Sequence, residues 1–228
     1  MSDSTTGRMF RMTEINLKQV SLSLAGKPVL NAIDLSVEKG QWITLTGPSG
    51  SGKSTILKLI ANLINPDSGI IFFQEKNIQE LDPINYRRQV SYAVQSAQLF
   101  GKTVKDNLDF PYLIRKKAID EKHEKSLLTA FDLPEDFLYK SVLDISGGQR
   151  QRVALARNFV FPPQVLLLDE VTTGLDELTK KIVRQVIEEN NHRGLTVIEV
   201  THEAEDLSEA KKIYIVDKGR IQQETAHE

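Results

Sequence analysis

A glycine-rich loop between a predicted strand and a predicted helix is the first feature of this sequence that could do chemistry. It follows the pattern Gly-x-x-x-x-Gly-Lys-Ser/Thr, in which glycines let successive backbone N–H groups turn toward nucleotide phosphates. The positive end of the following helix adds to that attraction. We expect Lys53 to bind the β- and γ-phosphates and the Ser54 hydroxyl to bind Mg²⁺. The loop alone does not distinguish kinases, GTPases and motor ATPases. Its residues are Gly47, Pro48, Ser49, Gly50, Ser51, Gly52, Lys53, Ser54 and Thr55.

Two acids follow an apolar segment, 165–168, that is typical of a strand buried on both faces of a parallel sheet. Ligands of α/β proteins bind at the carboxyl ends of such strands. We therefore expect Asp169 to hold Mg²⁺, directly or through water, and Glu170 to polarise the water that attacks the γ-phosphate. Either acid taken alone could equally cap a helix or end a strand in solvent. The phosphate loop in the same chain favours the catalytic interpretation.

A second anion-binding element precedes the helix-forming run at 150–157. Ser146, Gly147 and Gly148 combine a hydroxyl, free N–H groups and a helix dipole. Because one nucleotide has one γ-phosphate, a single chain then carries one anion site too many. Two copies facing head to tail would reconcile the sites, since each nucleotide would be held by Lys53 of one copy and Ser146 of the other. A plain helix N-cap is the alternative for the motif in isolation.

In this order the motifs resemble those of the ATP-binding subunits of ABC transporters, over essentially the whole chain after residue 12. The phosphate loop resembles Walker A, and Asp169-Glu170 resembles the end of Walker B. The segment 145–149, Ile-Ser-Gly-Gly-Gln, resembles the signature motif, which usually begins with leucine. The resemblance implies that the signature residues contact nucleotide across a dimer interface. These residues are Ser146, Gly147, Gly148 and Gln149.

Three further residues gain a role only through the resemblance. Gln95 matches the Q-loop glutamine, which contacts Mg²⁺ and water and faces the membrane subunit. Asp176 ends Thr173-Gly174-Leu175-Asp176, which resembles the D-loop that crosses the dimer interface. His202 matches the switch histidine that senses the γ-phosphate. Each residue taken singly is more typical of a surface or a helix cap.

Leu24 is a departure from the family pattern, which usually has an aromatic residue at this place to stack on adenine. Apolar contact with the base would remain, but stacking would be lost, an effect of about 0.5–1.5 kcal/mol by analogy with aromatic pairs. We therefore expect a weaker preference for ATP over GTP than in relatives that have the aromatic residue.

The elements that must position these residues follow from hydropathy patterning and turn signals. The resemblance implies an α/β fold: a P-loop NTPase core with a mixed sheet, an N-terminal antiparallel β-region, and an α-helical subdomain inserted at about 96–160. Residues 1–12 are expected to be a disordered extension, and 13–228 the ATPase domain. Strands are predicted at 15–24, 33–37, 42–46, 70–73, 90–94, 165–168, 195–200 and 213–216, a turn at 26–28, and helices from Lys53 to Leu63, at 104–114 and at 119–131.

Composition limits the possible functions. The 228 residues are 40% apolar and 26% charged, as in an ordinary folded protein. A net charge of -2 gives no electrostatic reason to expect nucleic-acid binding, and the absence of cysteine excludes disulfide and thiolate chemistry. No stretch approaches the ~18 apolar residues of a membrane span. We expect a cytoplasmic protein that attaches to the inner face of the membrane through a partner.

The resemblance implies an ATPase that uses ATP and Mg²⁺, forms a homodimer and drives a separate transmembrane permease without touching the cargo. The stretch 90–117 is similar to the ATPase subunits of bacterial iron-export transporters, which suggests iron as the cargo. Apolar residues after Gln95 are expected either to line a groove for a partner helix or to pack a core. They are Leu99, Phe100, Phe110, Pro111 and Tyr112.

Two alternatives remain from the residues alone. One is a non-transport ABC ATPase, although the chain has neither a long coiled-coil insertion nor a second ATPase half. The other is a nucleotide-gated module without turnover. The presence of Lys53, Asp169, Glu170 and His202 argues against that module, because these are the residues that turnover needs.

Overall fold

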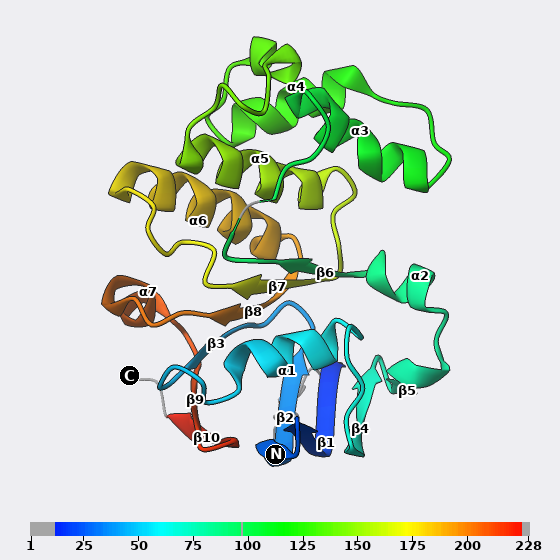
Figure 1. Ribbon diagram of the computed structural model, residues 1–228, viewed down its shortest axis with the longest axis vertical. Helices are drawn as coiled ribbons and strands as arrows, with labels where there is room; N and C mark the ends of the chain where they lie inside the picture. Colours follow the sequence, from blue (N-terminus) through cyan, green and yellow to red (C-terminus); the bar gives the residue numbers. More distant parts are fainter. Residues whose placement is uncertain (1–11, 97, 225–228) are drawn as a thin grey trace, which may run out of the picture.

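Two sheets organise the chain in the computed structural model, which describes residues 12–96 and 98–224 (Figure 1). The first is a four-stranded antiparallel sheet in the order β2-β1-β4-β5. The second has six strands in the order β10-β9-β3-β8-β7-β6, all parallel except β10. These sheets confirm the predicted α/β fold with a mixed sheet and an antiparallel region. The predicted extension at 1–12 lies outside the described residues, apart from Met12.

The elements have the following bounds. The strands of the antiparallel sheet are β1 (Thr13–Leu24), β2 (Lys27–Glu38), β4 (Ser68–Phe73) and β5 (Lys76–Asn77). Those of the mixed sheet are β3 (Trp42–Thr46), β6 (Val90–Ala93), β7 (Val165–Asp169), β8 (Thr196–Val200), β9 (Ile213–Asp217) and β10 (Arg220–Glu224). The α-helices are α1 (Lys53–Ile60), α2 (Pro83–Arg87), α3 (Val104–Ile114), α4 (Glu121–Ala130), α5 (Gly147–Phe159), α6 (Glu177–His192) and α7 (Ala204–Glu209).

The central strands are buried on both faces, which explains their nearly continuous apolar sequences. Along β7, Val165 and Leu167 belong to one apolar cluster and Leu166 and Leu168 to the other, as the alternation of a strand requires. The first cluster packs the sheet against α1 and the antiparallel sheet, and the second packs it against α5 and α6. Figure 1 shows this layering, with α3 and α4 beyond α5. The carboxyl ends of β3, β7 and β8 consequently meet at one edge.

Helices α3, α4 and α5 occupy the part of the sequence where an inserted helical subdomain is predicted. The prediction of α3 at 104–114 is confirmed, and a capping box between Thr103 and Asp106 fixes its start. The boundaries at about 96–160 stay a prediction. Among residues 12–96 and 98–224, no helix is long and apolar enough to cross a membrane.

Several predicted boundaries are wrong. The helix predicted from Lys53 to Leu63 ends at Ile60, the strand predicted at 195–200 begins at Thr196, and the strand predicted at 33–37 runs from Lys27 to Glu38. The expected turn at 26–28 is shorter, because Ala25 and Gly26 both adopt positive φ and β2 begins at Lys27. The strand expected at 90–94 ends at Ala93. The helix expected at 119–131 begins only at Glu121, since the Asp120 carboxylate accepts a hydrogen bond from the N–H of His123 and so caps it.

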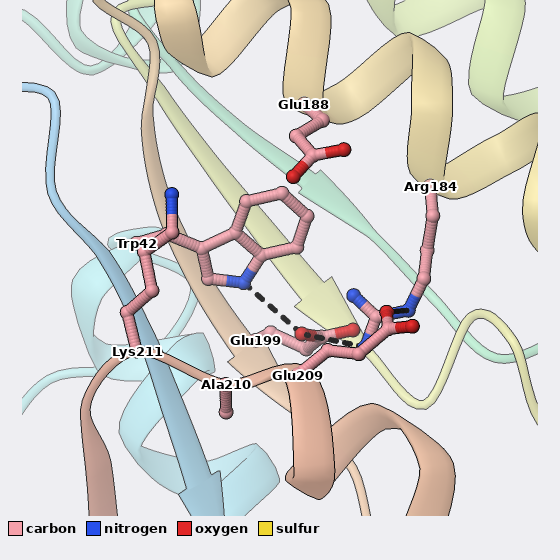
Figure 2. Close-up of a pocket in the computed structure, with 7 residues that line it drawn as sticks. All are labelled: Trp42, Arg184, Glu188, Glu199, Glu209, Ala210 and Lys211. Carbon is pink, nitrogen blue, oxygen red and sulfur yellow. Dashed lines mark hydrogen bonds and ion pairs between the residues drawn. The ribbon is translucent and has the colours of Figure 1, made fainter. Parts of the chain in front are cut away.

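A buried polar cluster lies between the sheet and α6 (Figure 2). Glu199 occupies a central position of β8, on the face that turns toward α6, and is only 3% exposed. The Trp42 indole N–H donates to its carboxylate at 3.1 Å, and the guanidinium of Arg184 lies 3.9 Å away. These side chains line a small cavity of about 50 Å³. Burial, and secondarily the charges of Asp206 and Glu209, raise the pKa of Glu199 to about 7, although Arg184 and Trp42 oppose the shift.

We predict that Glu199→Gln flattens the pH dependence of stability. Because the pKa of Glu199 is higher in the folded than in the unfolded chain, its stabilising contribution is complete below the unfolded pKa and is lost as the pH rises through about 7. The loss is on the order of 1–3 kcal/mol. Urea unfolding at pH values from 5 to 8 measures it. Glu188→Gln, an exposed change at the rim of the same cavity, should keep the wild-type slope. An unchanged slope in Glu199→Gln would contradict the prediction.

Candidate functional site

The phosphate loop connects the end of β3 to the start of α1. Lys53 is the first residue of the helix and is 7% exposed. Its ammonium group donates to the carbonyls of Gly47 and Pro48, at 2.8 and 2.9 Å, so the loop is wrapped around the charge. The first helical hydrogen bond runs from Ile56 N–H to Gly52 O. The N–H groups of the preceding helical turn therefore lack helical partners and can serve a phosphate.

Two glycines of the loop allow contacts that no side chain could make. At Gly47 the backbone has φ +134°, and an added Cβ would lie 2.1 Å from the carbonyl oxygen of Val216 in β9. Gly52 has φ +110°, and its Cβ would lie 2.6 Å from the side chain of Leu30. The loop is thus pressed against β9 on one side and β2 on the other. This close packing explains the glycine spacing of the motif.

Asp169, the last residue of β7, binds two hydroxyl groups from neighbouring elements. The Ser54 hydroxyl donates to Oδ1 at 2.8 Å, and the Tyr92 hydroxyl donates to Oδ2 at 2.5 Å. Burial and the adjacent carboxylate raise the pKa of Tyr92, so its hydroxyl stays protonated and donates. The predicted pair Ser54 and Asp169 is therefore brought together, and Tyr92 is an addition that no sequence motif indicated.

Glu170 follows in a left-handed conformation, with φ 52°. Such a backbone costs a non-glycine residue about 1–3 kcal/mol, and here hydrogen bonds hold it. Its N–H donates to Val200 O at 3.0 Å, and its carbonyl accepts from the N–H of Thr173 at 3.2 Å. This conformation places its Oε1 3.4 Å from Nδ1 of His202, just beyond the end of β8. The predicted base and the predicted switch histidine are therefore neighbours, a geometry suited to positioning a water molecule.

The signature residues form the start of α5. Ser146 is the N-cap, and a capping box joins it to Gln149: the N–H of Gln149 donates to the serine hydroxyl, and the N–H of Ser146 donates to Gln149 Oε1. Asp176 is the N-cap of α6, and its carboxylate accepts hydrogen bonds from both the N–H and the hydroxyl of Thr179. An added Cβ on Gly148 would lie 3.5 Å from the hydroxyl of Thr179, so the starts of α5 and α6 lie side by side.

The predicted residues fall into two groups. The first group lies at the carboxyl ends of neighbouring parallel strands and at the start of α1. It contains Lys53, Ser54, Asp169, Glu170 and His202. Ser146 and Asp176 gather at the helix starts, and within residues 12–96 and 98–224 no hydrogen bond or ion pair joins the two groups. The roles of individual residues stay predictions.

Asp206, which sequence reasoning missed, joins the segment after β7 to the segment after β8. This residue of α7 is 1% exposed and accepts hydrogen bonds from the hydroxyls of Thr172 and Thr201, both at 2.9 Å, and from Arg184 Nε at 2.9 Å. Thr172 lies between Glu170 and the predicted D-loop, and Thr201 precedes His202. Asp206 therefore fixes the segment after Glu170 and the segment before His202 relative to each other.

Gln95 is exposed beyond the end of β6, directly after Val94, which lines a groove of about 460 Å³. Leu99, Phe100 and Phe110 line this groove, as one of the two sequence hypotheses predicts. Tyr112 instead packs in the apolar core, and Pro111 lines an adjacent pocket. Phe100 and Phe110 contact each other edge to face, with ring centroids 5.0 Å apart.

Comparisons with known proteins agree with this arrangement. Residues 30–173 match the family model described as ABC transporter. The chain is 41% identical over 200 residues to the probable iron export ATP-binding protein FetA of Escherichia coli (strain K12), covering 87% of this chain and 89% of that protein. It is 39% identical over 214 residues to the spermidine/putrescine import ATP-binding protein PotA of Mycoplasma capricolum, covering 92% of this chain and 60% of that protein.

A solved structure has the same fold with nucleotide products bound. It is the dimeric post-hydrolysis state of the ATP-binding cassette MJ0796 with ADP and Pi. The TM-score is 0.84 at 26% identity, covering 94% of this chain and 99% of that one.

We predict that Leu24→Tyr strengthens ATP binding relative to GTP. Leu24 is 47% exposed at the tip of the β1–β2 hairpin, and Leu30 of the same hairpin contacts the phosphate loop. An aromatic ring here should add about 0.5–1.5 kcal/mol of base stacking, or roughly 2- to 12-fold in affinity. Competition of ATP and GTP for a fluorescent nucleotide measures the preference. Ile119→Tyr, at another exposed apolar position, is the control. Strong selectivity for ATP in the wild-type chain would contradict the premise.

Proposed function

The chain belongs to the ABC transporter family and is an ATP-hydrolysing transporter subunit, and from that premise we propose that two copies close around two ATP molecules to drive a separate membrane permease. The observation that carries this proposal is that the two predicted anion sites of one chain lie at separate helix starts, with no described hydrogen bond or ion pair between them. The loop around Lys53 is one, and the capped start of α5 at Ser146 is the other. The dimeric form of a relative that holds ADP and Pi supports it.

In the proposed dimer, each phosphate chain is bound by the loop of one copy and by the α5 start of the other. The N–H groups of Gly147 and Gly148 are in the first turn of α5, where helix geometry leaves them without helical partners. Ser146 is exposed, so its hydroxyl is accessible to a second copy. Asp176, beside this helix start, would lie in the same interface.

The oxygen atoms near the phosphate loop fit Mg²⁺. A serine hydroxyl and a carboxylate lie 2.8 Å apart at Ser54 and Asp169, and such hard oxygen donors are the ligands this ion prefers. We assign Ser54, Asp169 and Gln95 to the metal. When bound, Mg²⁺ neutralises charge that develops on the transferred phosphoryl group. Lys53 supplies a fixed positive charge to the same phosphates.

Hydrolysis in this proposal depends on Glu170 and His202. The Glu170 carboxylate orients water for attack on the γ-phosphate, and His202 contacts that carboxylate at 3.4 Å. Because the strained backbone of Glu170 is held by Val200 and Thr173, the carboxylate is positioned before substrate binds. Preorganisation of this kind lowers the barrier without rearrangement during the reaction.

The groove beside Gln95 is the proposed contact with the permease. Its apolar lining residues Leu99, Phe100 and Phe110 suit the apolar face of a short helix. The chain would then lie at the cytoplasmic face of the membrane without touching the cargo. Iron export is the cargo we propose, and the similarity to FetA supports it.

We predict that Glu170→Gln lowers phosphate release at least about 100-fold, as expected for loss of a general base, and traps an ATP-bound dimer. Light scattering with ATP measures the dimer. Adding Ser146→Arg should abolish it, because the arginine would block the α5 start of one copy from the nucleotide of the other. Ser126→Arg, an exposed change elsewhere in the helical region, should leave the dimer intact. Equal dimerisation of the two double variants would contradict the shared site.

We predict that an integral membrane protein co-purifies with the tagged chain from native membranes. In vesicles containing that pair, ATP should drive movement of Fe²⁺ and leave spermidine in place, since the proposed cargo is iron. Radiolabelled cargo measures both, and the pair with Glu170→Gln is the control. Movement of spermidine without iron would contradict the cargo assignment and leave the ATPase proposal intact.

A further inference from the structure

Tyr92 occupies the position where the proposed permease groove meets the proposed metal site. It is a residue of β6, the edge strand of the mixed sheet, and lies opposite Leu167 of β7 in the parallel register. Its side chain is partly buried against the apolar cluster on the α1 side of the sheet. It also lines the groove that contains Leu99 and Phe100. Its hydroxyl reaches Asp169, the last residue of β7.

That hydroxyl completes the binding of both oxygens of the Asp169 carboxylate. Tyr92 donates to Oδ2 at 2.5 Å, while Ser54 donates to Oδ1 at 2.8 Å. Hydrogen bonds from a hydroxyl to an ionised oxygen are short and about twice as strong as neutral ones. Ser54 would exchange partners when a cation binds, because its hydroxyl is itself a proposed metal ligand. The bond from Tyr92 can remain, since the phenol is not one of the assigned ligands.

We propose that Tyr92 is a positioning residue that holds the Asp169 carboxylate in the orientation needed for the divalent cation bound with nucleotide. This inference rests on the proposed function of the site. Partners that orient a metal ligand in this way typically account for about 10- to 100-fold in metal affinity or activity. Tyr92 is also among the residues that line the groove, so the proposed metal carboxylate and the proposed permease contact share one residue of β6.

Tyr92→Phe tests the inference, because it removes only the hydroxyl and keeps the ring. The readout is Mn²⁺ binding to the chain loaded with a non-hydrolysable ATP analogue, followed by electron paramagnetic resonance of free Mn²⁺. We expect about tenfold weaker Mn²⁺ binding in the variant. Binding of the nucleotide in EDTA should stay at the wild-type value. The Mg²⁺ concentration for half-maximal hydrolysis should rise by a similar factor, whereas simple destabilisation would lower the maximal rate without moving that concentration.

Tyr139→Phe is a matched control. Its hydroxyl also donates to a carboxylate at 2.5 Å, that of Glu121, but in the helical region. That variant should bind Mn²⁺ as the wild type does. Wild-type Mn²⁺ affinity in Tyr92→Phe would overturn the inference while leaving the proposed function intact. Failure of the wild-type chain to bind Mn²⁺ with nucleotide would instead refute the proposed metal site itself.

Discussion

The hydrogen bond between Ser54 and Asp169 joins the phosphate loop to the catalytic end of the sheet. Ser54 is the second residue of α1, directly after Lys53, so fixing its hydroxyl on β7 also fixes the ammonium group and the loop wrapped around it. Glu170 follows Asp169, so its carboxylate is set relative to the same loop. Parallel strands make this possible, because they bring their carboxyl ends to one edge. This contact between α1 and β7 therefore sets the phosphate loop and the two acids relative to each other before a cation takes the Ser54 hydroxyl.

Charge gives a reason why, in the proposed dimer, the remaining anion contacts would come from another copy. The carboxylates of Asp169 and Glu170 would repel a phosphate, and near the loop that repulsion is offset by Lys53, by free N–H groups and, in the proposal, by Mg²⁺. The two helix starts at Ser146 and Asp176 make no described hydrogen bond or ion pair with Lys53, Asp169 or Glu170. A two-fold dimer makes each interface contact twice from one set of residues. Two copies of a chain that each carry two incomplete anion sites could thus form two complete sites, each built from the loop of one copy and the α5 start of the other.

The contiguous motifs could be predicted from sequence because their chemistry and their local structure coincide. Glycines at a strand-to-helix turn indicate the turn and also a phosphate site. Acids at the end of an apolar strand indicate the strand and also the residues that face a ligand. Tyr92 and Asp206 could not be found in this way, since each meets its partners only through strand register or tertiary packing. The role of Glu199 could not be predicted from the mostly apolar strand around it. The partners that offset its cost of burial, Trp42 and Arg184, come from other elements. The early start of β2 depends on a left-handed alanine, which propensity disfavours.

Asp206 and Tyr92 each hold a different part of the site. Asp206 binds Thr172 and Thr201, and Tyr92 binds Asp169. Any shift of the segment that contains Thr172 toward a second copy must either carry Asp206 along or break a buried hydrogen bond. Asp206 also bonds Thr201, so the same shift acts on His202 one residue later. Leaving the buried Thr172 hydroxyl without an acceptor costs about 1–3 kcal/mol, so concerted movement is the less costly course. In the proposed dimer, the geometry of His202 against Glu170 would therefore respond to the interface even though neither residue is part of the helix starts.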